Sequence, residues 1–335
     1  MFIFAKPIVK KMTKTDICRT YLKKFPNFPN AKLARIIVKD NPLMFDSIEA
    51  TRSIIRGITG NMGKRVVKID AENKTPPKPM NPYKLPASDE TSFTPFVIKA
   101  SKVLVLSDIH IPYHSISALT AVFDYTKKMK IDAILLNGDV LDFFGLSRYC
   151  KDPKKRNFAE ELKSFEEFMD ILNNIYKCKI YLKIGNHEER YNHFLWQKAG
   201  EIADVEEFQL EEIIKKRAKN VTIIGEKRII KLGHLNVLHG HEFAGGVFSP
   251  VNIARGLFLK AKVSAMQGHN HQTSEHSESN LEGKLTTTFS LGCLCELNPE
   301  YMPINKWNHG FAIVDIDAKG NFEVQNKRIL KGKVL

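Results

Sequence analysis

The sequence predicts an α/β fold in which a β-sandwich containing hairpins is flanked by helices. From residue 101 onward, short apolar segments typical of strands alternate with longer amphipathic segments typical of helices. The C-terminal segments FAIVDID and FEVQNKRIL, joined by AKGN, predict an antiparallel hairpin. This mixture favours a sandwich over a purely parallel, doubly wound sheet.

The first 75 residues are expected to be helical. Three amphipathic segments predict helices over residues 13–25, 30–40 and 46–60. Asn30 is the predicted N-cap of the second, and Asp46 with Glu49 forms a variant capping box at the start of the third. Two short helices around the turn DNPLMF are compatible with a helix-turn-helix.

The rest of the chain predicts strands and helices in alternation. Apolar segments that are rich in β-branched residues and bounded by turn residues are typical of strands, and longer amphipathic segments are typical of helices. The expected strands are 101–108, 133–139, 179–186, 221–225, 235–240, 263–268, 286–294 and the hairpin 311–330, and the expected helices are 116–129, 158–176, 187–199, 205–218 and one opened by Ser249-Pro250.

A proline-rich segment divides the chain. Six prolines lie within residues 75–95, which predicts a stiff, extended linker. The sequence therefore predicts a basic helical segment over 1–74, a linker over 75–95 and a larger domain over 96–335.

The positive charge is concentrated near the N-terminus. The chain carries a net charge of +14, and residues 1–75 hold 16 Lys and Arg against 6 Asp and Glu, a difference of +10. This favours a polyanion such as nucleic acid as partner, although a Lys-rich, soluble surface explains it as well. Arg52 and Arg56 lie one helical turn apart and are candidate nucleic-acid contacts. Arg148, with the basic residues that follow it, could contact substrate phosphates or lie in a solvated loop.

Several sequence features bear on location. The five cysteines are few and scattered, which is typical of a reducing compartment. No apolar run reaches the ~20 residues of a membrane span, and MFIFAKPIVKK does not resemble a signal peptide. We therefore expect a cytoplasmic protein without a membrane partner. Cys293 and Cys295 are expected to be two buried side chains on a strand rather than half of a zinc site.

Polar side chains follow five of the predicted strands at the point where each strand ends. The carboxyl edge of an α/β sheet is where binding sites are built. Five such strand ends carrying only Asp, Asn and His are hard to explain as ordinary turns. The side chains are Asp108, His110, Asp139, Asn186, His239, His269 and His271.

These residues have the chemistry of metal ligands. Two carboxylates, one amide and four imidazoles are too many for one tetrahedral zinc ion. They suit two divalent ions that share a carboxylate. Mixed nitrogen and oxygen ligands fit Mn, Fe, Zn, Co or Ni, of which we expect Mn.

The motifs DIH, GDVLD, GNHEE, HGH and GHNH, in this order, resemble the calcineurin-like metallophosphoesterase superfamily over about residues 100–315. The resemblance implies two sheets flanked by helices in α/β/β/α layers, with a dinuclear metal centre. By the resemblance, one metal takes Asp108, His110 and His271, the other takes Asn186, His239 and His269, and Asp139 bridges them.

The resemblance also implies roles outside the ligand set. His187 protonates the leaving oxygen or stabilises the transition state, Asp142 orients a histidine, and His241 lies next to the ligands without being one. Phe143-Phe144 replace the Arg-Gly of protein Ser/Thr phosphatases, which argues against that activity. DFFGLSRYCKDP, GCLCELNPEYMP and NKWNHGFA are similar to a branch common in phage genomes, which would place the protein in the host cytoplasm.

The sequence thus predicts a phosphoesterase, and we expect a phosphodiesterase or nuclease acting on nucleic acid. A phosphomonoesterase acting on a nucleotide, small molecule or phosphoprotein is the alternative. A non-catalytic binding protein is disfavoured because no ligand is missing. The oligomeric state is not predicted.

Overall fold

The computed structural model describes residues 13–25, 28–59, 82–83, 85–86, 93–148, 157–225, 227–243 and 251–335. It divides into two compact units, Met1–Lys74 and Thr75–Leu335. Most of the predicted linker and the basic residues 151–156 lie outside the described residues. No helix in the described part of the chain is both long enough and apolar enough to cross a bilayer.

The N-terminal unit contains α1 (Lys14–Lys24), α2 (Asn30–Asp40) and α3 (Ile48–Thr59). Thr13 and Asp16 form a capping box at the start of α1. The helices enclose a small core in which Leu33, Ile37 and Ile55 are fully buried. This core supplies the tertiary packing that such short helices need.

Two predicted helix starts in this unit are wrong. Asn30 is the first residue of α2 rather than its cap, and its side chain makes no capping bond. At α3 the Ser47 hydroxyl accepts from the Ala50 N–H, whereas Asp46 pairs with Lys14 at 3.3 Å. Ser is as good a cap as Asp, so composition alone did not separate the neighbouring candidates.

The larger unit contains two β-sheets that pack face to face, as predicted. In the first, β2 to β5 run parallel, whereas β11, β12 and β13 add antiparallel pairs on the other side of β2. Its order is β13 (Lys333–Val334), β12 (Phe322–Leu330), β11 (His309–Ile316), β2 (Lys102–Leu106), β3 (Ala133–Asn137), β4 (Lys179–Lys183) and β5 (Val221–Ile224).

The second sheet mixes parallel and antiparallel pairs. Strands β7 and β8 are parallel, and β9 and β10 form an antiparallel pair. Strands β1, β6 and β9 were not predicted, because they are short or, like the SEHSES of β9, largely polar. The order is β1 (Phe96–Val97), β6 (Ile230–Leu232), β7 (Leu235–Leu238), β8 (Ala265–Gln267), β10 (Leu285–Ser290) and β9 (Ser274–Ser279).

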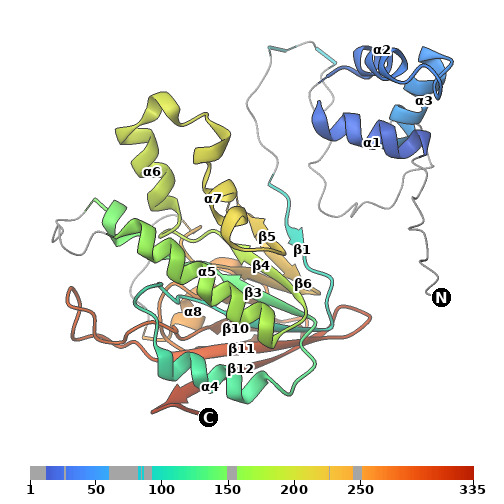
Figure 1. Ribbon diagram of the computed structural model, residues 1–335. Coiled ribbons are helices and arrows are strands. Elements are labelled where there is room, and N and C mark those ends of the chain that lie inside the picture. The colour runs from blue at the N-terminus through green and yellow to red at the C-terminus, as the bar shows by residue number, and fades with distance from the viewer. Residues whose placement is uncertain are drawn as a thin grey trace, which may run out of the picture. The chain divides into compact units, whose positions relative to one another are not determined.

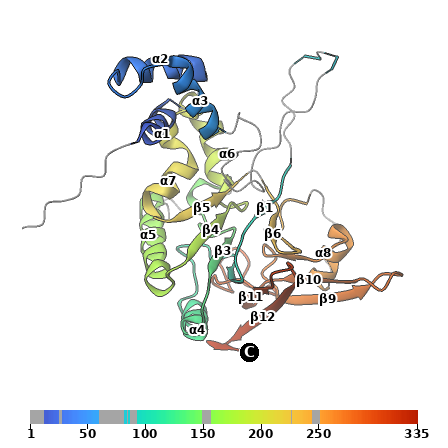
Figure 2. The same cartoon turned by 90° about the vertical axis from the view of Figure 1, so that its right-hand side faces the viewer.

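Helices cover the outer faces of the two sheets, which confirms the predicted layers (Figures 1 and 2). Helices α4 (Ile116–Thr126), α5 (Phe158–Ile175), α6 (Glu189–Lys198) and α7 (Leu210–Arg217) share a core with the first sheet. Helix α8 (Ile253–Ala261) packs on the second. It begins after its cap Asn252 rather than at the predicted Ser249-Pro250, which lie outside the described residues. Short 3-10 helices occur at Phe144–Leu146, Gly200–Ile202 and Glu206–Phe208.

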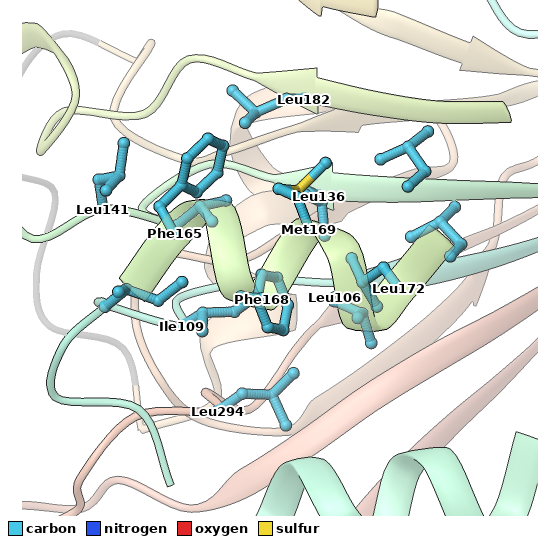
Figure 3. Packing of buried hydrophobic residues seen from close by; sticks show 14 of the residues in the cluster. Leu106, Ile109, Leu136, Leu141, Phe165, Phe168, Met169, Leu172, Leu182 and Leu294 are labelled. Atoms are coloured by element: carbon cyan, nitrogen blue, oxygen red, sulfur yellow. The ribbon is translucent and has the colours of Figure 1, made fainter. Parts of the chain in front are cut away.

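The alternation along β2 explains the two cores. Val103 and Val105 point between the sheets, whereas Leu104 and Leu106 point toward the helices. Figure 3 shows Phe165 and Met169 of α5 packed in the core between the first sheet and the helices. Burying each such side chain stabilises the fold by ~1.5–3 kcal/mol. The cores fix β2, β3 and β4 and therefore the loops that follow them.

Candidate metal centre

The polar residues at the strand ends meet at one edge of the sandwich. In the first sheet, Leu106 pairs with Leu136 and Asn137 pairs with Lys183, so β2, β3 and β4 end side by side. In the second sheet, Leu238 pairs with Gln267, so β7 and β8 also end together. All five loops with predicted ligands therefore begin at neighbouring positions.

Five of the seven predicted ligands have a left-handed backbone. Such positive φ angles are uncommon for residues other than glycine, and each costs on the order of 1–3 kcal/mol. These left-handed residues turn the chain sharply after β2, β3 and β8, so that the polar side chains of each loop face the same space. The residues are Asp108, His110, Asp139, His269 and His271, with φ between 52° and 66°.

Two glycines allow these loops to approach closely. A Cβ atom on Gly138 would lie 2.5 Å from Nδ1 of His239, and φ at this glycine is +85°. A Cβ atom on Gly185 would collide with the Asp139 carboxylate. The glycines of GDVLD and GNHEE are therefore needed for the close contact between loops.

Asp139 lies at the middle of the cluster, as a bridging ligand must. Its Oδ2 atom is 3.2 Å from Nε2 of His239 and 3.9 Å from Nε2 of His110. Its Oδ1 atom accepts the backbone N–H of His187 at 2.9 Å. The carboxylate thus faces imidazoles from both sheets.

Two overlapping groups of candidate ligands share Asp139. Ligand atoms of Asp108, His110 and Asp139 lie within 4.8 Å of one another, and so do those of Asp139, His239 and His269. The remaining two predicted ligands adjoin these groups: Nε2 of His271 is 3.2 Å from Oδ1 of Asp108, and Oδ1 of Asn186 is 3.2 Å from Nε2 of His239.

The donor atoms in this cluster fit cations. The Asn137 carbonyl accepts from Nδ1 of His239, and Asp142 accepts from Nδ1 of His110, so in the neutral rings both Nε2 lone pairs are left on the side of the Asp139 carboxylate, at 3.2 and 3.9 Å. Lone pair and carboxylate repel unless a positive charge lies between them. Burial lowers the pKa of His239, but the charge and hydrogen bond of Asp139 outweigh it and raise the pKa to about 10. The site therefore favours a positive charge here, and nitrogen and oxygen ligands suit divalent metals.

A buried network surrounds His187. Nδ1 of His187 lies 3.0 Å from the Asp142 carbonyl and 3.2 Å from its carboxylate. Arg190 donates to Nε2 of His187 at 2.9 Å and to the Asp142 carbonyl at 2.8 Å. Since arginine only donates, Nε2 accepts and the proton lies on Nδ1. Burial lowers the pKa of His187, but Asp139 and Asp142 outweigh it, so the pKa is raised.

The structure therefore places Asp142 between two histidines, since the same carboxylate contacts His110 at 2.9 Å and His187 at 3.2 Å. Arg190 is a site residue that the sequence analysis missed. It follows GNHEE by one position, and its basic side chain on the first turn of a helix beside the motif was the available signal.

Glu188 is the second missed residue. Its carboxylate is fully buried and accepts four backbone N–H groups, those of Gly185, Asp139, Val140 and Leu141, at 2.7–3.0 Å. Burial and the neighbouring Asp139 raise its pKa. Glu188 thereby fastens the loop after β4 to the loop after β3, which carries Asp139. The sequence showed an acid in GNHEE but not that its partners are backbone groups.

Glu242 fastens the HGH loop to β4. It accepts the N–H groups of His239 at 3.0 Å and Gly240 at 2.6 Å, and it pairs with the fully buried Lys183 at 2.9 Å. Burial raises the pKa of Glu242, but Lys183 outweighs it and lowers the pKa to about 2. His241 lies 3.3 Å from Glu189 and belongs to neither of the two ligand groups that share Asp139.

The predicted nucleic-acid contacts are not among the residues that form the centre. Arg52 and Arg56 are on α3 of the other unit, and both pair with Glu49, at 3.3 and 3.2 Å. Arg148 is exposed at the end of a described segment. Cys293 and Cys295 are buried, as expected, but lie beyond the end of β10, and Sγ of Cys295 is 4.0 Å from Nδ1 of His271.

Known proteins resemble this chain. The Gene 54 protein of Mycobacterium phage L5 is 25% identical over 235 residues, which cover 66% of this chain and 91% of that protein. This relative agrees with the resemblance to a phage branch. Solved structures include zinc-bound Vps29 from Entamoeba histolytica, 15% identical over 70% of this chain and 96% of that one with a TM-score of 0.37. A dimetal phosphatase from Danio rerio is 10% identical, and the match covers 70% of this chain and 97% of that one with a TM-score of 0.36.

A family model decides the assignment. The model for calcineurin-like phosphoesterases matches residues 101–282, more than half of the chain. These residues include the two candidate ligand groups that share Asp139. The chain belongs to the calcineurin-like phosphoesterase family and is a hydrolase of phosphate esters, with candidate ligands for a dinuclear centre of divalent metals.

Proposed function

We propose that this protein is a metal-dependent phosphodiesterase that cleaves nucleic acid. The observation that carries the proposal is the pair of ligand groups that share the Asp139 carboxylate. We assign one divalent ion to Asp108, His110, Asp139 and His271, and the other to Asp139, Asn186, His239 and His269. Mn²⁺ is the expected ion, with Fe, Zn, Ni and Co as alternatives.

The metals and the protein have separate tasks. When bound, two divalent ions polarise a phosphoryl group and acidify a water molecule. His187 stands next to this space, since its Nε2 atom is 3.8 Å from Oδ2 of Asp139. We assign it the role of donating a proton to the leaving oxygen. Nε2 must first take up that proton from solvent and lose its bond to Arg190, which frees the guanidinium to bind the phosphate.

The N-terminal unit supports nucleic acid as the substrate. The basic residues of 1–75 exceed the acidic ones by ten, and a surface of this sign attracts phosphate backbones. The Arg52–Arg56–Glu49 group keeps one net positive charge on α3. We propose that this unit holds the polymer while the larger unit cleaves it.

The decisive experiment is a substrate panel with added Mn²⁺. It compares bis-p-nitrophenyl phosphate, p-nitrophenyl phosphate, cyclic nucleotides, and single- and double-stranded DNA and RNA. We expect the wild-type protein to cleave the diester and nucleic acid, and Asp139→Asn to cleave neither. Asp315→Asn is the control and should stay active, because Asp315 of β11 pairs with Lys102 of β2. Preference for the monoester, without nucleic-acid cleavage, would contradict the proposal.

A further inference from the structure

A cavity of about 960 Å³ opens beside the metal centre. His110 and Asp142 belong to its lining, and Asp142 contacts His187. A group attached to a phosphate at the centre can therefore extend directly into it. The volume lies at the upper end of the usual range for small-molecule sites.

Aromatic side chains form one wall of this cavity. Trp307 lies against the His271 ring, with ring centroids 4.1 Å apart, and Tyr301 meets Trp307 edge-to-face at 6.4 Å. Tyr301 is 64% exposed, so its ring surface is accessible. Tyr113 and Phe158 also line the cavity. Flat rings of this kind stack on planar heterocycles.

The loop that carries Tyr301 and Trp307 is braced by its own side chains. The Asn305 amide donates to the carbonyls of Leu297 and Met302 at 2.6 and 2.8 Å. The Asn305 side-chain oxygen accepts the backbone N–H of Trp307 at 2.8 Å. At its base the Asn308 N–H bonds to the His271 carbonyl at 2.9 Å, so the aromatic wall is tied to a candidate ligand. A preorganised wall loses little entropy when it binds a ligand.

The charges on the described lining of the cavity oppose a second phosphate. Glu160 and Glu296 are exposed and line it, and none of its described lining residues is Lys or Arg. Glu161 also lines it but accepts the Phe143 N–H at 2.6 Å. Carboxylates repel phosphates, whereas they accept hydrogen bonds from sugar hydroxyls and base amino groups.

We propose that this cavity binds a nucleoside joined to the phosphate at the metal centre, with its base on Tyr301 and Trp307 and no further phosphate inside. This inference rests on the proposed function and restricts it. The enzyme would act on a nucleotide at a strand end, or on a short or cyclic nucleotide, rather than along an uninterrupted strand that crosses the cavity.

The test is competitive inhibition of the hydrolysis of ethyl p-nitrophenyl phosphate by monophosphates. Thymidine 5'- and 3'-monophosphate are compared with methyl phosphate, phenyl phosphate and thymidine 3',5'-bisphosphate. We expect at least one thymidine monophosphate to bind ~5- to 100-fold more tightly than methyl phosphate, the range expected for one stacked base. The bisphosphate should bind more weakly than that monophosphate.

Variants of exposed residues locate the effect. Tyr301→Ala should abolish most of the preference for thymidine monophosphate, whereas Tyr301→Phe, which keeps the ring, should retain it. Glu296→Lys should improve binding of the bisphosphate. Glu323→Lys, the same charge change on β12 at a residue that does not line the cavity, should leave binding of the bisphosphate unchanged.

The outcomes separate the two proposals. Equal inhibition by methyl phosphate and both thymidine monophosphates, with the diester still hydrolysed, overturns the nucleoside site and leaves the phosphodiesterase intact. Equal inhibition by phenyl phosphate and thymidine monophosphate also overturns it, because the cavity would then accept any aryl group. Absence of diester hydrolysis, with monoester hydrolysis retained, contradicts the proposed function itself.

Discussion

The two units of this protein carry their charges in opposite ways. Residues 1–75 have a net charge of +10, and the ion pairs of the N-terminal unit are largely exposed, such as Lys14–Asp46 with 48% and 88% side-chain exposure. The remaining 260 residues have a net charge of only +4, yet Asp108, Asp139 and Glu188 are at most 2% exposed.

Exposed and buried charges of this protein therefore have different effects. Exposed pairs contribute ~0–1 kcal/mol each and are screened by salt, so exposed charge serves mainly to attract a partner. Buried carboxylates interact strongly with neighbouring imidazoles and metals, because little water screens them. Net charge therefore bears only on the partner that we propose for the small unit, and it says nothing of the reaction in the large one.

The largest expected effect concerns the shared ligand. Asp139→Asn should remove nearly all activity, because it weakens the binding of both ions at once. Metal analysis should find fewer than two ions per chain, while binding of nucleic acid through the small unit persists. Two ions per chain with unchanged turnover would exclude Asp139 as the bridge.

The next effect separates proton transfer from metal binding. His187→Asn should retain both metals but lower turnover ~10²–10⁴-fold, the usual contribution of a positioned general acid. The loss should shrink for substrates with good leaving groups. His193→Asn on α6 is the control, since its ring contacts Trp196 rather than the centre. A fall in metal content would instead make His187 a ligand.

A smaller effect is expected at the support of the bridging loop. In Glu188→Gln one oxygen, which accepts two backbone N–H groups, is replaced by a donor that faces both of them, and each bond left unmade costs ~1–3 kcal/mol. Thermal unfolding should occur at a lower temperature, and metal affinity should fall ~10–100-fold. Glu189→Gln, next in sequence but partly exposed, should show little of either effect. Wild-type behaviour of Glu188→Gln would remove its assigned role.

Removing the small unit tests the other side of the comparison. A chain starting near residue 90 should still hydrolyse a small diester, because the centre lies wholly in the larger unit. Its affinity for DNA or RNA should fall, with a shallower salt dependence as phosphate contacts are lost. Filter binding at two salt concentrations measures both. Unchanged affinity would dismiss the small unit as a nucleic-acid module.

The smallest effect is expected for two arginines. Arg52→Ala combined with Arg56→Ala should weaken nucleic-acid binding by part of the truncation effect only. Glu49, which pairs with both, then adds an uncompensated negative charge. Removing two exposed cations of the larger unit, Arg328 and Lys331, controls for net charge alone. Equal losses in both double variants would mean that α3 is no specific contact.

The sequence predicted the centre better than its supports. Asp139 and His269 could be predicted as candidate ligands because each follows an apolar strand, and this pattern can be recognised in the sequence alone. Glu188 and Glu242 were not predicted because the partners that explain them are far away in the sequence: Glu188 accepts N–H groups of the loop after β3, and Glu242 pairs with Lys183 of β4. The cavity was not predicted for a similar reason, since Trp307 and His271 are far apart in the sequence and meet where the Asn308 N–H bonds to the His271 carbonyl.

The left-handed ligand positions have a consequence for the evolution of this fold. At each of them glycine or asparagine relieves strain, so a change that destroys activity can increase stability. Selection for catalysis must then oppose a steady advantage of inactive variants. We expect descendants that keep the sandwich and abandon the reaction to arise readily, and to be harder to unfold than their active ancestors.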